Sequence, residues 1–307
     1  MNRRNFTRTL AGATLGTAAL SLDPLAAPAH AAADQTPAES PFKISIMLWT
    51  VWGKLPFEER LEKVAEAGYH AVELVGEYSR RDSKWTEDDF RRYNKKRAEL
   101  GITFDTTAGM RHGVGDPSVR EALLADLREQ LKIMEKIECQ QLIVMSGNVV
   151  PGLSPQAQHD SCVEGLKRAA ELVEGKGVTL LLENIDLEEN PHYYMWSVPE
   201  AFKIIEEVNH PQVKVLYDLY HAQISGGNLI ANLQRHAGNV GLIHIADVPG
   251  RHEPGTGEIN YLNIYKKLAE LNYSRYVAME FLPAGDAVKI LAHAREEALQ
   301  AEQGHRS

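Results

Sequence analysis

The chain has 307 residues, of which 44% are hydrophobic and 24% are charged, a composition typical of globular proteins. Its formal net charge of −9 argues against the broad basic surface that nucleic-acid binding needs, so we expect no nucleic-acid partner. Only two cysteines are present, and they form no thiolate cluster, which excludes a zinc–thiolate site. For Cys139 and Cys162, two buried thiols are favoured over a disulfide.

The first 33 residues are predicted to be an export signal rather than part of the fold. The pair Arg3 and Arg4 precedes the apolar run LAGATLGTAALSL, and small residues follow that offer cleavage sites such as residues 29–31. This order is typical of a twin-arginine (Tat) signal peptide, and the apolar run is too short to span a bilayer comfortably. We expect a periplasmic or secreted protein with no transmembrane segment in the mature chain; a retained N-terminal anchor is the alternative.

Residues 34–41 are polar and contain proline, so they are predicted to link the signal to one domain over 42–300, with a tail at 301–307. Within that domain, eight short apolar runs recur, each followed by a loop and most of them by a helical pattern. The runs are mostly continuously apolar, as expected of strands that are buried on both faces. The predicted strands lie at 43–49, 70–75, 102–107, 141–147, 178–185, 213–220, 240–247 and 276–282.

Between these runs, Leu, Ile and Ala recur at three- and four-residue spacing, which predicts amphipathic helices. Thr86 is placed to begin one helix and Gly68 to end another, while Ser197 is a further N-cap candidate. His159 lies on a predicted helix and is expected to be solvated. The predicted helices cover 57–68, 86–101, 118–137, 154–177 and 197–209.

Eight strand–helix units predict an α/β protein that forms a single-domain (β/α)8 TIM barrel. An open, doubly wound sheet is the alternative. Such a sheet would usually carry a glycine-rich phosphate loop after its first strand. The segment LWTVWGKLPF contains neither G-x-G-x-x-G nor a Walker pattern, so a nucleotide-binding fold is disfavoured.

Active sites of TIM barrels lie at the carboxyl ends of the strands. Strands five to eight each end near one metal-competent side chain, with gaps of 35, 26 and 36 residues between them. Three carboxylates and one imidazole suit one divalent ion, Mg, Mn, Co or Zn, whose charge would offset their mutual repulsion. A structural ion pair is the alternative for any one of them alone. The predicted ligands are Glu183, Asp218, His244 and Glu280.

Three more polar residues follow these strand ends and are expected to face the same pocket. Glu189, His221 and Arg251 come six, three and seven residues after Glu183, Asp218 and His244. Trp49 and Trp52, after the first strand, are candidates for an apolar wall beside a sugar-sized ligand.

The loop at 247–258 is rich in ionisable residues, Pro and Gly. We expect it to hold Arg251 over the metal. Its other charged residues are expected to brace the loop rather than to react; these are Asp247, His252, Glu253 and Glu258.

The segments LLLEN, YDLYH, IHIADVPGRHEPGTGEINY and AMEF resemble the sugar-phosphate isomerase/epimerase-type TIM-barrel superfamily, and within it the hydroxypyruvate isomerases most closely. The resemblance covers residues 42–300. It implies one divalent metal on the four predicted ligands, an acid–base pair formed by Glu183 and Glu280, and substrate contacts from His221, Glu189 and Arg251. One position departs from the pattern. Hydroxypyruvate isomerases often carry Gln where this chain has His244, whereas ketose 3-epimerases carry His there.

The resemblance implies an isomerase that converts hydroxypyruvate to tartronate semialdehyde, an interconversion of aldose and ketose type. Such a reaction passes through an enediolate, with one glutamate taking the α-proton and another returning a proton. Arg251 suits a substrate carboxylate. The alternatives are a ketose 3-epimerase, a metal-dependent lyase or hydrolase acting on an exported keto-sugar or keto-glycoside, and a non-catalytic sugar-binding protein. A homo-oligomer is left open.

Overall fold

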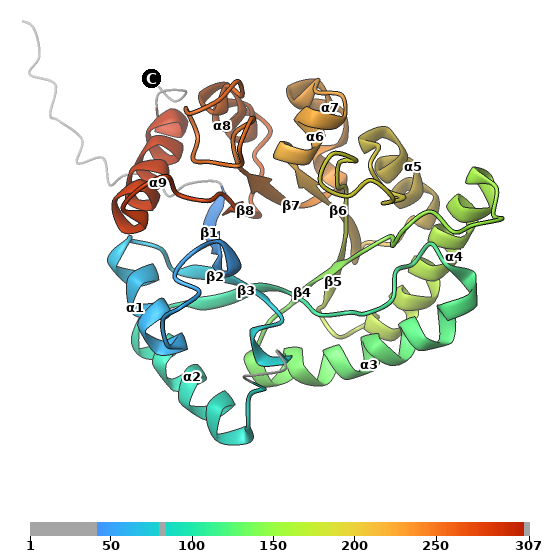
Figure 1. Ribbon diagram of the computed structural model, residues 1–307, viewed down its shortest axis with the longest axis horizontal. Helices are drawn as coiled ribbons and strands as arrows, with labels where there is room; N and C mark the ends of the chain where they lie inside the picture. Colours follow the sequence, from blue (N-terminus) through green and yellow to red (C-terminus); the bar gives the residue numbers. More distant parts are fainter. Residues whose placement is uncertain (1–41, 80–83, 304–307) are drawn as a thin grey trace, which may run out of the picture. The chain divides into compact units, whose positions relative to one another are not determined.

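The computed structural model describes residues 42–79 and 84–303; the expected signal peptide (1–33), the linker (34–41) and residues 304–307 lie outside the described residues. The described chain forms a closed barrel of eight parallel strands in chain order, with β1 paired to β8 (Figure 1). The predicted TIM barrel is confirmed, and the open doubly wound sheet is wrong. The strands are β1 (Lys43–Met47), β2 (Ala71–Val75), β3 (Thr103–Ala108), β4 (Gln141–Val144), β5 (Thr179–Glu183), β6 (Val213–Asp218), β7 (Val240–Ile245) and β8 (Tyr276–Met279).

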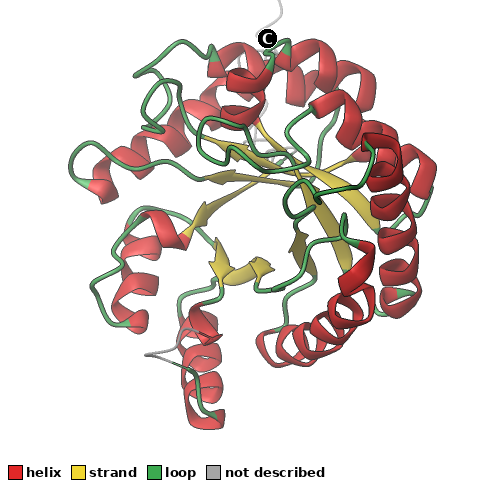
Figure 2. Ribbon diagram, turned by 45° about the vertical axis from the view of Figure 1, so that its right-hand side comes forward, coloured by secondary structure: helices red, strands yellow, loops and turns green. Residues whose placement is uncertain are grey.

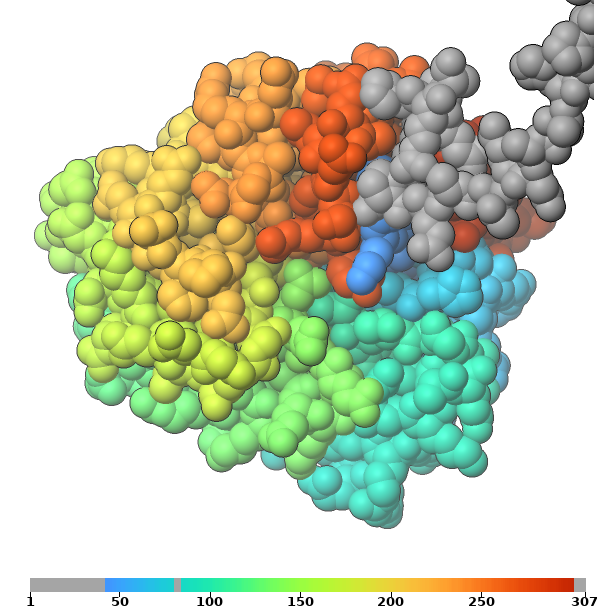
Figure 3. Space-filling model, turned by 180° about the vertical axis from the view of Figure 1, so that it is seen from behind, coloured from blue at the N-terminus to red at the C-terminus, as the bar shows by residue number. Residues whose placement is uncertain are grey.

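Helices surround the strands (Figure 2), and the segments follow one another around the barrel in chain order when it is seen from behind (Figure 3). The five predicted helices are confirmed, each ending within four residues of its predicted end. Thr86 caps one of them with a capping box to Asp89, whereas the Ser197 side chain makes no capping hydrogen bond. The helices are α1 (Phe57–Glu66), α2 (Glu87–Glu99), α3 (Arg120–Ile137), α4 (Pro155–Val173), α5 (Val198–Val208), α6 (Leu219–Ser225), α7 (Leu229–His236), α8 (Tyr261–Glu270) and α9 (Ala287–Gln303).

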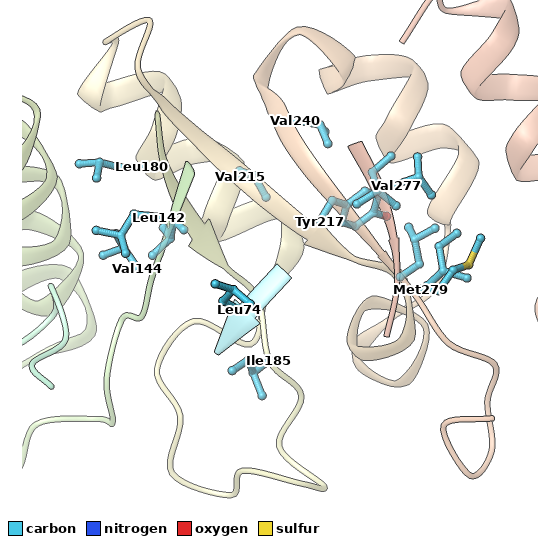
Figure 4. Close-up of a cluster of buried hydrophobic side chains, with 14 of the residues drawn as sticks. Leu74, Leu142, Val144, Leu180, Ile185, Val215, Tyr217, Val240, Val277 and Met279 are labelled. Atoms are coloured by element: carbon cyan, nitrogen blue, oxygen red, sulfur yellow. The ribbon is translucent and has the colours of Figure 1, made fainter. Parts of the chain in front are cut away.

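Strand side chains alternate between two buried layers. One layer lies between strands and helices and includes Leu180, Val215 and Val277 (Figure 4). The other is a separate cluster whose members come from six strands, which meet only inside the barrel: Met47, Ile143, Leu181, Leu216, Leu242 and Ala278. Because strand side chains repeat every two residues, the next inward positions on β5 to β8 are those of the four predicted ligands.

His159 corrects one expectation, because its side chain is buried rather than solvated. It lies on α4, which packs against α5. Its Nδ1 is 2.6 Å from Oε1 of Glu200, and its Nε2 is 3.0 Å from Oε2 of Glu207. The two carboxylates of α5 give both ring nitrogens a partner, which is the condition for burying a polar side chain.

The cysteines agree with a further expectation. Cys139 and Cys162 are both free and buried, and burial raises the pKa of each thiol. Among the described helices, none combines the length and hydrophobicity required to span a bilayer.

Candidate active site

The four predicted ligands converge at the carboxyl end of the barrel. Each offers one ligand atom, these atoms lie within 4.8 Å of one another, and all four side chains are buried. Nδ1 of His244 is 2.7 Å from Oε2 of Glu280, 3.8 Å from Oε1 of Glu183 and 3.8 Å from Oδ2 of Asp218. The imidazole nitrogen therefore faces all three carboxylates.

The chemistry of this group fits a divalent cation. Within the described part of the chain, Oδ2 of Asp218, Nδ1 of His244 and Oε2 of Glu280 are buried and make no aligned hydrogen bond. Nδ1 of His244 and Oε2 of Glu280 are only 2.7 Å apart, but their geometry is not that of a hydrogen bond. Buried polar atoms normally have a partner. Oxygen and nitrogen atoms that converge without aligned hydrogen bonds to one another are the donor set that a mixed-ligand metal site needs.

Burial and charge separate the pKa values of the two glutamates. Burial raises the pKa of Glu183 to about 7, and His244 only partly opposes this effect. Burial acts in the same direction on Glu280, but the charges of His244 and Arg251 outweigh it and lower the pKa below the usual value. Two carboxyl groups with separated pKa values suit an acid–base pair.

Arg251 brings the predicted substrate residues together. One guanidinium nitrogen is 2.8 Å from Oε2 of Glu189 and 3.3 Å from Nε2 of His221, and the other is 2.9 Å from Oε2 of Glu280. The guanidinium also faces the rings of Trp49 and Tyr220, 5.6 and 4.9 Å from their centroids. It is thus held between carboxylates and two aromatic rings beside the predicted metal ligands.

The two tryptophans that follow β1 differ in position. Nε1 of Trp49 donates a hydrogen bond of 2.9 Å to Oε1 of Glu280, so this ring borders the site. Trp52 packs against the main hydrophobic core.

The loop after β7 is organised by Asp247, which confirms its expected bracing role. The buried carboxylate accepts hydrogen bonds from the backbone N–H groups of Val248, Gly255, Gly257 and Ile259. The backbone N–H of Arg251 donates to the carbonyl oxygen of Asp247. Asp247 therefore fixes the backbone that carries the guanidinium.

The other three predicted braces also make contacts that tie down this loop. His252 pairs through Nδ1 with the carbonyl oxygen of Leu282, 2.7 Å away, and Glu253 accepts from the backbone of Ala284. Glu258 accepts a hydrogen bond from Gln223.

Two buried carboxylates near the site were missed from the sequence. Glu73 lies within β2, and its Oε2 is 3.1 Å from Nε2 of His244. Asp186 follows β5, and its Oδ2 is 2.5 Å from Nδ1 of His221. The lone carboxylate inside the apolar strand AVELV was the available signal for Glu73. Asp186 stands among other acidic loop residues, so no local signal singled it out.

Comparisons with known proteins agree on the family. A family model described as a xylose isomerase-like TIM barrel matches residues 61–303. The 2-oxo-tetronate isomerase of Pectobacterium atrosepticum is 29% identical, over 79% of this chain and 93% of its own length. The hydroxypyruvate isomerase of Escherichia coli is 28% identical, over 78% and 93%. A crystal structure of an AP endonuclease, family 2, from Brucella melitensis superposes with a TM-score of 0.74 at 27% identity, over 83% of this chain and 98% of that one.

Proposed function

The chain belongs to the xylose isomerase-like TIM-barrel family, and on this premise we propose that it is a divalent-metal-dependent isomerase of a small α-hydroxy keto acid of the hydroxypyruvate type. The observation that carries the proposal is that Arg251, the one cation among the predicted substrate contacts, lies 2.9 Å from Glu280 at the predicted metal ligands. A carboxylate-bearing substrate held there would place its hydroxy-carbonyl carbons beside both glutamates. The names of the two curated relatives support this substrate class.

A divalent ion held by Glu183, Asp218, His244 and Glu280 would polarise the substrate carbonyl and stabilise the enediolate charge. Glu280, whose pKa is lowered, is ionised and suited to take the proton from the hydroxyl-bearing carbon. Glu183, in the same group of four side chains, is suited to return a proton to the former carbonyl carbon, while the hydroxyl proton passes to the former carbonyl oxygen. Trp49 orients Glu280 through its hydrogen bond.

Arg251 supplies recognition of the acid. Its planar guanidinium can form two parallel hydrogen bonds to a carboxylate, a geometry that lysine cannot reproduce. Glu189, Trp49 and Tyr220 hold it in place before substrate arrives. We propose the conversion of hydroxypyruvate to tartronate semialdehyde as the first reaction to test.

A ketose 3-epimerase is the second candidate, because His244 is the residue that those enzymes carry at this position. A lyase would use the same proton abstraction to expel a leaving group from the neighbouring carbon. A DNA-directed activity, as in the name of the Brucella neighbour, is disfavoured by the net charge of −9, since phosphate contacts need a basic surface.

The test is isomerisation of hydroxypyruvate in D2O by the metal-loaded protein, followed by NMR. We expect deuterium in the product, and a loss of both turnover and exchange of about 100- to 10,000-fold in Glu280→Gln. Glu171→Gln, at an exposed carboxylate on α4, is the matched control. Dialysis against a chelator should abolish activity and added Mn²⁺ should restore it. Normal exchange in Glu280→Gln removes this residue from the mechanism. In a parallel assay with ketoses, a product epimeric at C3 selects the second candidate.

A further inference from the structure

Asp186 connects two of the predicted substrate contacts, although it is not itself among them. It lies on the loop after β5 and its side chain is fully buried. Its Oδ2 is 2.5 Å from Nδ1 of His221. Its Oδ1 accepts hydrogen bonds of 2.7 and 2.9 Å from the backbone N–H groups of Glu188 and Glu189. Both oxygens are therefore engaged by the substrate-binding part of the site.

The first contact determines the tautomer of His221. An ionised carboxylate only accepts hydrogen bonds, so Nδ1 of His221 must carry the proton that is shared with Asp186. The opposite nitrogen, Nε2, is 3.3 Å from a guanidinium nitrogen of Arg251, which only donates. In the contact with Arg251, Nε2 is therefore the acceptor, and it faces the predicted metal ligands, 3.6 Å from Oδ2 of Asp218.

The second contact holds the start of the loop that carries Glu189. The side chain of Glu189 is 38% exposed, so packing alone does not fix it. Its two oxygens accept hydrogen bonds from Tyr220 and Arg251, each 2.8 Å long. These bonds form only if the backbone of Glu189 is in place, and Asp186 holds that backbone.

A second cation site is the competing explanation, because Asp186, Glu189 and His221 offer ligand atoms within 4.8 Å of one another. The hydrogen bonds argue against it. Two backbone N–H groups and the Nδ1 proton already point at the Asp186 carboxylate. A cation would have to displace these donors from a fully buried group.

We propose that Asp186 is a positioning residue for substrate binding. Its carboxylate presents Nε2 of His221 as an acceptor and holds Glu189 against Arg251, so that the three groups meet the substrate together. The kinetic consequence rests on the proposed function, whereas the tautomer of His221 does not depend on it.

The direct test is nitrogen NMR of the full chain labelled with ¹⁵N-histidine, with the His221 signals assigned by their loss in His221→Gln. We expect the Nδ1–H tautomer in the wild type. In Asp186→Asn the amide can present an N–H to Nδ1, so we expect the Nε2–H tautomer to appear. Asp88→Asn, the same change at an exposed carboxylate, should leave the His221 spectrum unaltered. An Nε2–H tautomer or a doubly protonated ring in the wild type at neutral pH, or no change in Asp186→Asn, overturns the proposal.

The kinetic test separates positioning from metal binding. Asp186→Asn should raise KM for hydroxypyruvate by about 10- to 100-fold while the affinity for Mn²⁺ stays at the wild-type value. In a His221→Ala background the same change should have a smaller effect, because the partner is gone. Equal effects in both backgrounds, or two bound Mn²⁺ ions in the wild type and one in Asp186→Asn, overturn the proposal. If hydroxypyruvate is not turned over, the proposed function fails, and the NMR measurement still decides the role of Asp186.

Discussion

The carboxylate of Glu73 lies behind His244 inside the barrel, with its Oε2 3.1 Å from Nε2 of the imidazole. Both side chains are buried. Burial raises the pKa of Glu73, and the neighbouring His244 opposes this effect. A carboxylate on one ring nitrogen favours the tautomer whose other nitrogen is free. Nδ1 of His244 is thereby directed at the three carboxylates of the predicted metal site.

Replacement of Glu73 should therefore weaken metal binding without removing a ligand. We expect Glu73→Gln to lower the affinity for Mn²⁺ by about 10- to 100-fold, because the amide can also present a donor and no longer selects one tautomer. Isothermal titration of the metal-free protein measures this. Glu129→Gln, at an exposed carboxylate on α3, is the control. An unchanged dissociation constant would show that Glu73 serves only packing.

Arg251 should discriminate acids from neutral substrates. We expect Arg251→Lys to raise KM for hydroxypyruvate by about 10- to 100-fold, since a bidentate, charge-assisted contact is lost. KM for dihydroxyacetone, which has no carboxylate, should change much less. Steady-state kinetics with both substrates measure the ratio. Arg251 has a φ of +57°, a region equally unfavourable for lysine, so backbone strain is matched between the two proteins. Equal changes for both substrates would assign Arg251 a structural role.

Asp247 should determine the order of the loop that carries Arg251. In Asp247→Asn, one oxygen acceptor is replaced by an amide N–H that faces backbone donors. We expect a loss of about 1 to 3 kcal/mol in the free energy of unfolding. Hydrogen exchange should accelerate at residues 248–259, and KM for hydroxypyruvate should rise. Denaturant unfolding and exchange mass spectrometry measure these effects, with Asp88→Asn as the control. Wild-type exchange in this loop would contradict the bracing role.

His159 should make stability depend on pH. Burial by itself lowers the pKa of His159, but hydrogen bonds to Glu207 and Glu200 outweigh it and raise the pKa. A raised folded-state pKa gives a contribution that is fully present below the unfolded value of about 6.5 and is lost as pH rises through the folded value. The pKa of Glu207 is lowered, so this partner stays ionised in that range.

We therefore expect the wild type to exceed His159→Gln in free energy of unfolding by about 1 to 3 kcal/mol near pH 6, with the difference shrinking at higher pH. Denaturant titrations at a series of pH values measure this difference. His210→Gln, at a residue beyond the C-terminal end of α5, serves as the control. A difference that stays constant with pH would mean that the imidazolium is not what stabilises the α4–α5 contact.

The sequence by itself determined the order of the strands, five of the helices and the positions of the four predicted ligands. Continuous apolar runs revealed the strands because both of their faces are buried. Each of the four predicted ligands comes at or next to the end of such a run, and parallel strands bring their carboxyl ends to one rim. The residue types and the spacing were therefore enough to predict that Glu183, Asp218, His244 and Glu280 form one site. In the fold, their candidate ligand atoms lie within 4.8 Å of one another.

Only the tertiary structure decided which buried groups stand behind these residues. Glu73 and His244 are 171 positions apart in the chain, and they meet because the barrel closes and turns alternate residues of β2 and β7 inward. Asp186 reaches His221 across two adjacent strand ends, and His159 is buried because α5 supplies a carboxylate for each ring nitrogen. Periodicity along a chain predicts which way a side chain points. The partner that it meets depends on how distant segments pack, and that packing fixes tautomers, pKa values and burial.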